Sequence, residues 1–199
     1  NDIKDITELI LNKKNQVISV VGNGGMGKTS TVVKILYDLI ENPENPFEAI
    51  IWITLKTKTL SNGEFVEIED SIRSINDVIE KGKMEMLFNK EDDAMESVLC
   101  FMKVFKVLLV LDNMETINTG DVNNFLRRIP DNSKVLITSR LGIGEFEVRQ
   151  KIEGLSRVDA ITYFRELSKY YGLDLHKKSD EEIYNIVHKC LYNNPLSIK

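Results

Sequence analysis

A glycine-rich loop between an apolar segment and an amphipathic segment constrains this chain more than any other feature. Residues 16–21 are rich in β-branched side chains and end at Gly22, which predicts a buried strand. Beyond the loop, apolar residues recur at helical spacing over 28–41, which predicts a helix. The order strand, glycine loop, helix is typical of proteins in which helices alternate with parallel strands. The sequence therefore predicts an α/β fold.

The loop, Gly22-Asn23-Gly24-Gly25-Met26-Gly27-Lys28-Thr29, satisfies the pattern G-x-x-x-x-G-K-[ST] of the P-loop, or Walker A motif. Its glycines let backbone N–H groups turn inward around phosphate oxygens without Cβ collisions. The helix that follows adds the positive end of its dipole. We therefore predict that all eight residues bind nucleotide, that Lys28 contacts the β- and γ-phosphates, and that the Thr29 hydroxyl binds Mg²⁺.

The same loop also satisfies G-x-G-x-x-G through Gly22, Gly24 and Gly27, so a dinucleotide-binding fold is an alternative. That fold requires an acidic residue at the end of the second strand to bind the ribose. Here the second strand ends in Thr54-Leu55-Lys56-Thr57. A dinucleotide site also gives Lys28-Thr29 no role, so the pattern favours the P-loop.

A later apolar run, 106–111, ends at Asp112 and is typical of the strand that supplies an acid for magnesium, the Walker B strand. A carboxylate at the end of a buried strand is costly without a charge partner, so we predict that Asp112 is functional and binds Mg²⁺ with Thr29. Glu115 is the candidate for polarising the attacking water. The alternative for Glu115 is an exposed loop acid.

The strand predicted at 135–138 is followed by Ser139 and Arg140. P-loop ATPases with an additional strand between the Walker A and Walker B strands place this strand end at the γ-phosphate. Arg140 could there sense the phosphate or stabilise transition-state charge, and the alternative is a surface arginine in a salt bridge. The predicted catalytic residues are thus Lys28, Asp112, Glu115 and Arg140. For this class we expect a three-layer parallel sheet with strand order 5-1-4-3-2.

The remaining segments complete the predicted architecture. Further strands are predicted at 49–55 and 145–152, and further helices at 68–79, 94–105 and 122–129. After Gly154 the pattern is helical only, and Ser156 and Ser179 are candidate helix caps. We predict a nucleotide-binding α/β domain over 1–154 and the start of a small helical subdomain over 155–199.

One short motif suggests a different nucleotide. Asn89-Lys90-Glu91-Asp92 matches N-K-x-D, which recognises guanine in GTPases. In those proteins it follows both a D-x-x-G element and the magnesium strand, whereas here it precedes Asp112 and no D-x-x-G occurs between Thr29 and Asn89. We interpret it as a connector before a helix.

Charge and cysteine usage exclude other classes. The net charge is −5, with 26 basic and 31 acidic residues, so no basic footprint for nucleic acid is evident. No apolar run approaches the roughly 20 residues of a membrane span. Cys100 and Cys190 lack the spacing of a zinc site or a disulfide framework, and a reducing, cytoplasmic setting is expected. Both lie on apolar helical faces and are predicted to be buried.

Together these motifs resemble the NB-ARC branch of the STAND signalling ATPases, which includes apoptotic scaffolds, plant disease-resistance receptors and bacterial regulators or antiviral sensors. The segments that carry the resemblance are 22–30 (GNGGMGKTS), 51–53 (IWI), 107–115 (VLLVLDNME), 134–140 (KVLITSR), 153–156 (EGLS) and 193–198 (NNPLSI). The last resembles the G-x-P-L motif, whose proline lies near the base and sugar of bound ADP. The resemblance therefore adds Ser30 and Pro195 to the nucleotide-binding residues. Two departures are Asn113, where many relatives carry a second acid, and Asn194, where the motif often has glycine.

The resemblance implies an ATP/ADP-binding molecular switch. ADP would hold the two domains together at rest, and ATP with Mg²⁺ would release the helical subdomain and expose a surface for homo-oligomerisation, with slow hydrolysis. Contacts of the γ-phosphate with Lys28, Thr29, Asp112 and Arg140 exist in one nucleotide state only, so they can bias a two-state hinge. Since the chain begins at Asn1 without Met and ends inside a motif, we expect effector and sensor domains elsewhere in a longer chain.

Three other functions stay open. A DNA-acting ATPase related to replication initiators would need a basic face, which the charge balance disfavours. A small-molecule kinase usually carries an arginine-rich lid, but residues 61–100 contain a single arginine, Arg73. A scaffold that binds nucleotide without hydrolysis is kept open by Asn113.

Overall fold

A computed structural model describes residues 2–54, 58–61, 64–67, 94–115, 119–144 and 146–199. The chain divides into two compact units. The first comprises Asn1–Val21 and Thr29–Gln150, and the second comprises Gly22–Lys28 and Lys151–Lys199. The glycine loop thus belongs to the same unit as the C-terminal helices.

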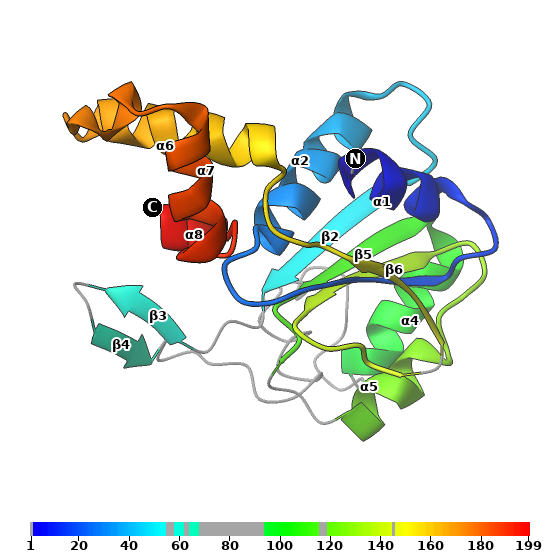
Figure 1. Ribbon diagram of the computed structural model, residues 1–199. Helices are drawn as coiled ribbons and strands as arrows, with labels where there is room; N and C mark the ends of the chain where they lie inside the picture. The colour runs from blue at the N-terminus through cyan, green and yellow to red at the C-terminus, as the bar shows by residue number, and fades with distance from the viewer. Residues whose placement is uncertain (1, 55–57, 62–63, 68–93, 116–118, 145) are drawn as a thin grey trace. The chain divides into compact units, whose positions relative to one another are not determined.

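The first unit is built on a five-stranded, all-parallel sheet of order β2-β5-β6-β1-β7 (Figure 1). Its strands are β1 (Val17–Val21), β2 (Ala49–Thr54), β5 (Val107–Asp112), β6 (Lys134–Ser139) and β7 (Glu147–Lys151). Counted along this sheet alone, the order is 5-1-4-3-2 when read from β7, as predicted. The additional strand, β6, pairs with β1 on one side and β5 on the other. The predicted α/β P-loop fold is confirmed.

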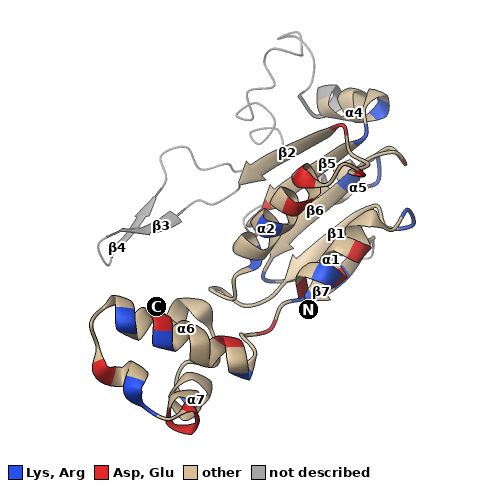
Figure 2. Ribbon diagram, turned by 90° about the horizontal axis from the view of Figure 1, so that it is seen from above, with Lys and Arg blue, Asp and Glu red and all other residues tan. Residues whose placement is uncertain are grey.

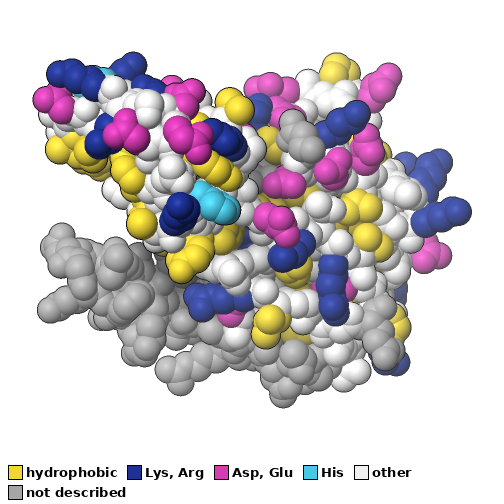
Figure 3. Space-filling model, viewed as in Figure 1, with side chains coloured by type: hydrophobic (Ala, Val, Ile, Leu, Met, Phe, Trp, Pro, Cys, Tyr) yellow, Lys and Arg dark blue, Asp and Glu magenta, His cyan; other side chains and the backbone are white. Residues whose placement is uncertain are grey.

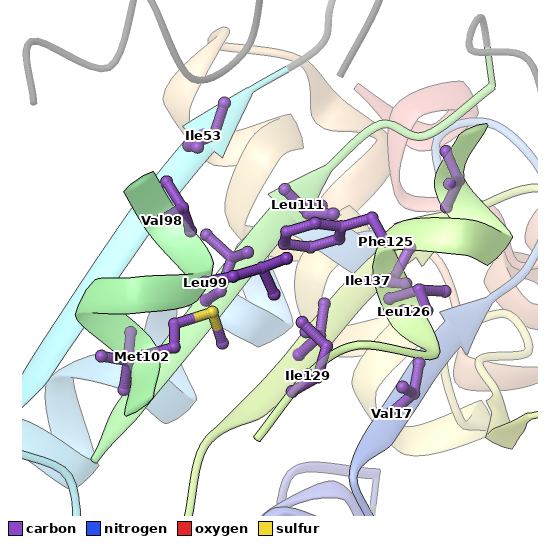
Figure 4. Packing of buried hydrophobic residues seen from close by; sticks show 14 of the residues in the cluster. Val17, Ile53, Val98, Leu99, Met102, Leu111, Phe125, Leu126, Ile129 and Ile137 are labelled. Carbon is purple, nitrogen blue, oxygen red and sulfur yellow. The ribbon is translucent and has the colours of Figure 1, made fainter. Parts of the chain in front are cut away.

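Helices cover both faces of this sheet. Figure 1 shows α1 (Asp2–Leu11) and α2 (Lys28–Glu41) on one face, and α4 (Ala94–Val104) and α5 (Thr119–Leu126) on the other. Because side chains alternate along a strand, odd-numbered strand residues such as Leu109 and Ile137 join the core formed with α4 and α5. In Figure 4, Phe125 points toward Leu111 and Leu99 within this core. Every residue of β5 is buried, as expected for a strand covered on both faces.

Several elements differ from the sequence predictions. Helix α1 was not predicted, although Ile6 and Ile10, one helical turn apart, are fully buried. An antiparallel pair, β3 (Lys58–Ser61) and β4 (Glu64–Glu67), was not predicted either. The helix predicted at 68–79 and the N-K-x-D motif at 89–92 lie outside the described residues.

The prediction that both cysteines are buried is wrong, because Cys100 and Cys190 are exposed. On α4 the buried face is formed by Val98, Leu99 and Met102, and at about 100° per residue Cys100 turns away from it. Cys190 is the C-cap residue of its helix and lies beyond the last buried position, Val187.

The second unit contains a small helical bundle. Its helices are α6 (Arg157–Tyr170), the short 3₁₀ helix η2 (Asp174–Lys177), α7 (Asp180–Lys189) and α8 (Pro195–Ile198). Ser156 caps α6, and Ser179 with Glu182 forms a capping box on α7, as the sequence predicted. Phe164 of α6 packs with Ile183 and Val187 of α7. Among the described helices, none has the length and apolar character needed to cross a bilayer.

Candidate functional site

The carboxyl ends of the parallel strands bring four polar side chains of the first unit together. Thr54 at the end of β2 is the register partner of Asp112 at the end of β5. Thr138 lies near the end of β6, which is paired with β5. Thr29 enters from the first turn of α2. In open α/β sheets this edge is the usual position of ligand sites.

Asp112 is the centre of this group. Its carboxylate accepts hydrogen bonds from the hydroxyls of Thr138 at 2.6 Å, Thr29 at 2.8 Å and Thr54 at 3.3 Å. The residue is only 6% exposed, so these donors take the place of water around a buried charge. A carboxylate oxygen and threonine hydroxyl oxygens are hard ligands of the kind that Mg²⁺ prefers. The predicted metal ligands, Thr29 and Asp112, are thus in direct contact.

The chain turns sharply after Asp112. Asn113 has a φ of 65°, in the left-handed region that asparagine tolerates better than most residues. Its N–H donates to the Thr138 hydroxyl at 2.8 Å, and the N–H of Met114 donates to the Thr138 carbonyl at 2.9 Å. The turn closes with the N–H of Glu115 on the carbonyl of Asn113 at 2.8 Å. The asparagine at this position therefore has a conformational reason.

This turn brings Glu115 to Arg140. The Arg140 Nε lies 2.9 Å from the Glu115 carboxylate, so the two candidate catalytic residues form an ion pair. The Glu115 side chain is 20% exposed and the Arg140 side chain 64% exposed. Because the Arg140 side chain is largely exposed, a competing anion can reach its guanidinium group. The salt-bridge alternative for Arg140 and the catalytic interpretation are thus compatible.

A second buried acid fixes the loop that follows β6. The Glu147 side chain is 2% exposed and accepts hydrogen bonds from the N–H groups of Ile143 at 2.7 Å and Gly144 at 3.2 Å. It also accepts from the Ser19 hydroxyl of β1 and from Arg149. Burial raises the pKa of Glu147, but these hydrogen bonds outweigh it and leave the pKa below its usual value. Glu147 thus acts as a structural anion, a role that the sequence did not reveal.

The P-loop itself lies in the second unit. The Lys28 ammonium group donates to the carbonyls of Gly22 at 2.7 Å and Asn23 at 3.1 Å, so it folds back over the start of the loop. The N–H of Met26 bonds to the Asn23 carbonyl at 3.4 Å. Gly27 has a φ of 89°, a backbone conformation that a residue with a side chain rarely adopts. Thr29 and Ser30 follow directly on α2 and are exposed.

The start of α8 contacts this loop within the same unit. The Asn194 side-chain amide donates to the Gly24 carbonyl at 2.9 Å, and the N–H of Leu196 lies 3.4 Å from the Gly25 carbonyl. Pro195, the residue predicted from the family resemblance, therefore lies between two residues that touch the P-loop backbone. A Cβ at Gly25 would lie 2.6 Å from the Asn194 Oδ1, so this approach requires glycine.

The backbone angles account for one departure from this motif. Tyr192 and Asn193 both have a φ of 52°, whereas Asn194 has a φ of −83°. Positive φ values, which suit glycine, thus occur at Tyr192 and Asn193, and the backbone at Asn194 does not require glycine. Asn194 is instead the N-cap of α8, where asparagine is among the preferred residues.

Three residues with the contacts described above were not predicted from the sequence. Thr54 and Thr138 are β-branched and are typical of strand interiors, so nothing local marks them as partners of Asp112. Only the pairing of β2, β5 and β6 brings them to one carboxylate. Asn194 is separated from Gly24 by 170 positions, and no spacing rule relates the two.

Comparisons with known proteins identify the family and the fold of this chain. A model of the NB-ARC domain family matches residues 1–156, while no curated protein sequence matches the chain. A solved STAND protein with a tetratricopeptide repeat sensor from Pyrococcus horikoshii is 19% identical, with a TM-score of 0.56, and the match covers 98% of this chain and 28% of that one.

Two further solved structures share the fold. Domain III of the replication initiation protein DnaA from Thermotoga maritima is 14% identical with a TM-score of 0.54, covering 98% of this chain and 76% of that chain. The Aeropyrum pernix ORC2 protein, solved as ADPNP-ADP complexes, is 10% identical with a TM-score of 0.56. The match covers 84% of this chain and 50% of that chain. At these identities the structural similarities establish the fold alone.

Proposed function

This chain belongs to the NB-ARC family, and on that premise we propose that it binds ATP and ADP with Mg²⁺ as the switch of a STAND-type signalling ATPase. The family and the P-loop fold make it a nucleotide-binding protein of the P-loop NTPase class. The finer proposal covers the resting state, hydrolysis and assembly. ADP occupies the resting protein, ATP promotes the active form, and hydrolysis is slow.

The observation that carries this proposal is the hydrogen bond from Thr29 to Asp112, 2.8 Å long. Thr29 directly follows Lys28 in the chain, so the phosphate-binding loop ends at the residue that touches the Walker B acid. Thr29 and Asp112 would hold Mg²⁺, which neutralises charge on the β- and γ-phosphates. Lys28 would exchange the carbonyls of Gly22 and Asn23 for phosphate oxygens, which accept stronger, charge-assisted hydrogen bonds.

The ion pair of Glu115 and Arg140 supports a switch that responds to the third phosphate. A γ-phosphate that takes Arg140 into a bidentate contact releases Glu115, which then becomes available to polarise water. ADP offers no such competitor, so the pair persists in the resting state. The two nucleotides therefore differ in contacts, as a ligand-driven two-state change requires.

Partners and assembly follow from the family premise. The Pyrococcus horikoshii STAND protein carries a tetratricopeptide repeat sensor, and this chain spans 28% of that protein's length. We place the present chain in a similar context, with sensor and effector domains in the same longer chain, homo-oligomerisation on activation and a cytoplasmic setting. Signalling in innate immunity or antiviral defence is the process proposed for it.

Nucleotide identification tests the proposal directly. The chain is purified without added nucleotide and denatured, and any released nucleotide is identified by chromatography. Near-stoichiometric ADP is the expected result, and a guanine nucleotide would contradict it. A chain that is empty and binds neither ADP nor ATP on titration would also refute the proposal.

The variant Lys28→Ala tests the role of the P-loop lysine in ATP binding. Loss of charge-assisted contacts worth about 3 kcal/mol lowers ATP affinity by about 100-fold or more. Lys34→Ala is the control, because Lys34 is an exposed lysine of the same helix that pairs with Asp38. Equal ATP affinity in the two variants would remove the P-loop assignment.

The initiator-like DNA-acting ATPase remains the alternative, since DnaA and ORC2 share the fold. Over the described residues, acidic and basic positions are interspersed along the helices (Figure 2), and charges of both signs lie together on the face shown in Figure 3. Such a surface does not favour duplex DNA. Binding of duplex DNA that weakens steeply with salt would support the alternative. Transfer of the γ-phosphate to a small-molecule acceptor would instead indicate a kinase.

A further inference from the structure

Asn194 makes a contact that the family resemblance does not explain. Its side-chain Nδ2 donates to the carbonyl of Gly24 at 2.9 Å, and its Oδ1 accepts from the N–H of Leu196 at 2.9 Å. The second bond is the N-cap of α8. Both ends of the amide are thus used, and the opposite orientation would set like groups against each other at both contacts.

The position of Asn194 is fixed from several sides within the second unit. Its own N–H bonds to the Leu191 carbonyl at 2.9 Å, and the carbonyl of Asn193 accepts from the N–H of Leu155 at 2.8 Å. A Cβ at Gly154 would lie 2.7 Å from the Asn193 carbonyl oxygen, so the chain before α6 packs closely against this turn. Asn194 is therefore held by backbone on one side and by the P-loop on the other.

The contact with Gly24 determines the orientation of one peptide group in the loop. No peptide bond of the described chain is cis, and in a trans peptide the carbonyl oxygen and the following N–H point in opposite directions. With the Gly24 oxygen held by Asn194, the N–H of Gly25 must point away from Asn194. The glycines at these positions could otherwise rotate with little steric restraint.

We propose that Asn194 is a positioning residue for nucleotide binding, which orients the Gly24–Gly25 peptide so that the Gly25 N–H faces a bound phosphate. P-loops bind phosphate through inward N–H groups, and a group oriented before binding loses less conformational entropy when the ligand arrives. The inference rests on the proposed nucleotide binding. It differs from the role predicted for Pro195, because Asn194 acts through the P-loop rather than by touching the nucleotide.

Two variants separate the contact with the loop from the helix cap. Asn194→Ser keeps a capping oxygen but is too short to donate to Gly24, and Asn194→Ala loses both functions. Affinities for ADP and ATP are measured with a fluorescent nucleotide analogue in competition with ADP or ATP. Thermal unfolding without nucleotide reports the stability of each variant, and hydrogen exchange reports the amides of residues 22–28.

We expect Asn194→Ser to weaken ADP and ATP binding equally, by about 3- to 10-fold, because ordering the freed peptide on binding costs about 1 kcal/mol. Exchange of the loop amides becomes faster, while the unfolding temperature of Asn194→Ser falls by less than that of Asn194→Ala, because the cap is kept. Asn194→Ala shows the same loss of affinity and also unfolds at a lower temperature.

The other outcomes overturn the inference. If nucleotide affinity is unchanged in Asn194→Ser, or falls only in Asn194→Ala, Asn194 acts only as the N-cap of α8. If Asn194→Ser does not fold, Asn194→Asp serves instead, because aspartate caps as well as asparagine but places an acceptor against the Gly24 carbonyl. If the amides of residues 22–28 exchange in nucleotide-free Asn194→Asp at the same rate as in the wild type, the inference is overturned. A wild-type chain that binds no nucleotide refutes the proposed function itself, a result distinct from equal binding by wild type and variant.

Discussion

Replacement of Asp112 tests whether the group at the end of β5 is a metal site or a structural network. A metal site and a structural network predict different effects of two substitutions on metal dependence and on stability. Asp112→Asn keeps the shape of the side chain and one carbonyl oxygen, so it can still accept from the Thr138 hydroxyl. Asp112→Ala removes every acceptor from the three threonine hydroxyls that now donate to it.

The burial of the donors sets the size of the effect. Thr138 is 1% exposed, so its hydroxyl would be left without an acceptor away from water, at a cost of about 1–3 kcal/mol. Thr29 and Thr54 are exposed, so water replaces the carboxylate there at little cost. Loss of a buried charge offsets part of the penalty. We therefore expect Asp112→Ala to lower the unfolding free energy by about 1–2 kcal/mol, or roughly 2–8 °C in the unfolding temperature.

The unfolding free energy of Asp112→Asn is expected to lie within about 1 kcal/mol of the wild-type value. Its ATP affinity, however, should no longer rise when Mg²⁺ is added. Changing a group that holds or orients a metal typically costs about 10- to 100-fold in metal affinity. The assay is ATP titration with Mg²⁺ or with EDTA, alongside thermal unfolding. Asp38→Asn, which changes a carboxylate of α2 paired with Lys34, controls for the change in net charge.

Two results would refute this reasoning. If Asp112→Asn gains as much ATP affinity from Mg²⁺ as the wild type does, Asp112 has no role with the metal. If Asp112→Asn is destabilised as much as Asp112→Ala, the hydrogen bond from Thr138 does not determine the stability of this group.

Three other predictions concern Glu115, Arg140 and Glu147. Glu115→Gln should slow phosphate release from ATP about 100-fold or more while nucleotide affinity is kept; unchanged turnover would exclude Glu115 as the base. Arg140→Ala should weaken ATP binding about tenfold and leave ADP binding unchanged, and equal losses for both nucleotides would contradict a γ-phosphate sensor. The pKa of Glu147 is lowered from 4.5, because its hydrogen bonds outweigh burial, so its stabilisation is present above about that pH and lost as pH falls through the folded pKa. In urea unfolding, Glu147→Gln should therefore be less stable than wild type at pH 7 and approach it near pH 3; a constant difference would contradict this assignment.

The fold was predictable because its signals are local and strong. An apolar strand, a glycine loop and an amphipathic helix follow one another, and α2 begins and ends where the periodicity predicts. Asp112 was also predictable, since a carboxylate at the end of a fully buried strand needs a compensating role. Helix α1 carries a similar local signal, because Ile6 and Ile10 lie one helical turn apart and both are buried.

The contacts that give the site its behaviour are of another kind. Glu115 and Arg140 each suggested a catalytic role separately, but their ion pair depends on the left-handed turn at Asn113, which no spacing rule encodes. Read from the sequence, Asn113 suggested the loss of a second acid. In the structure it is the residue that turns Glu115 toward Arg140. A β-branched residue rarely adopts a φ of 65°, so such a replacement would strain the turn and weaken the ion pair. A residue that departs from a family pattern can thus hold the geometry on which the neighbouring functional residues depend.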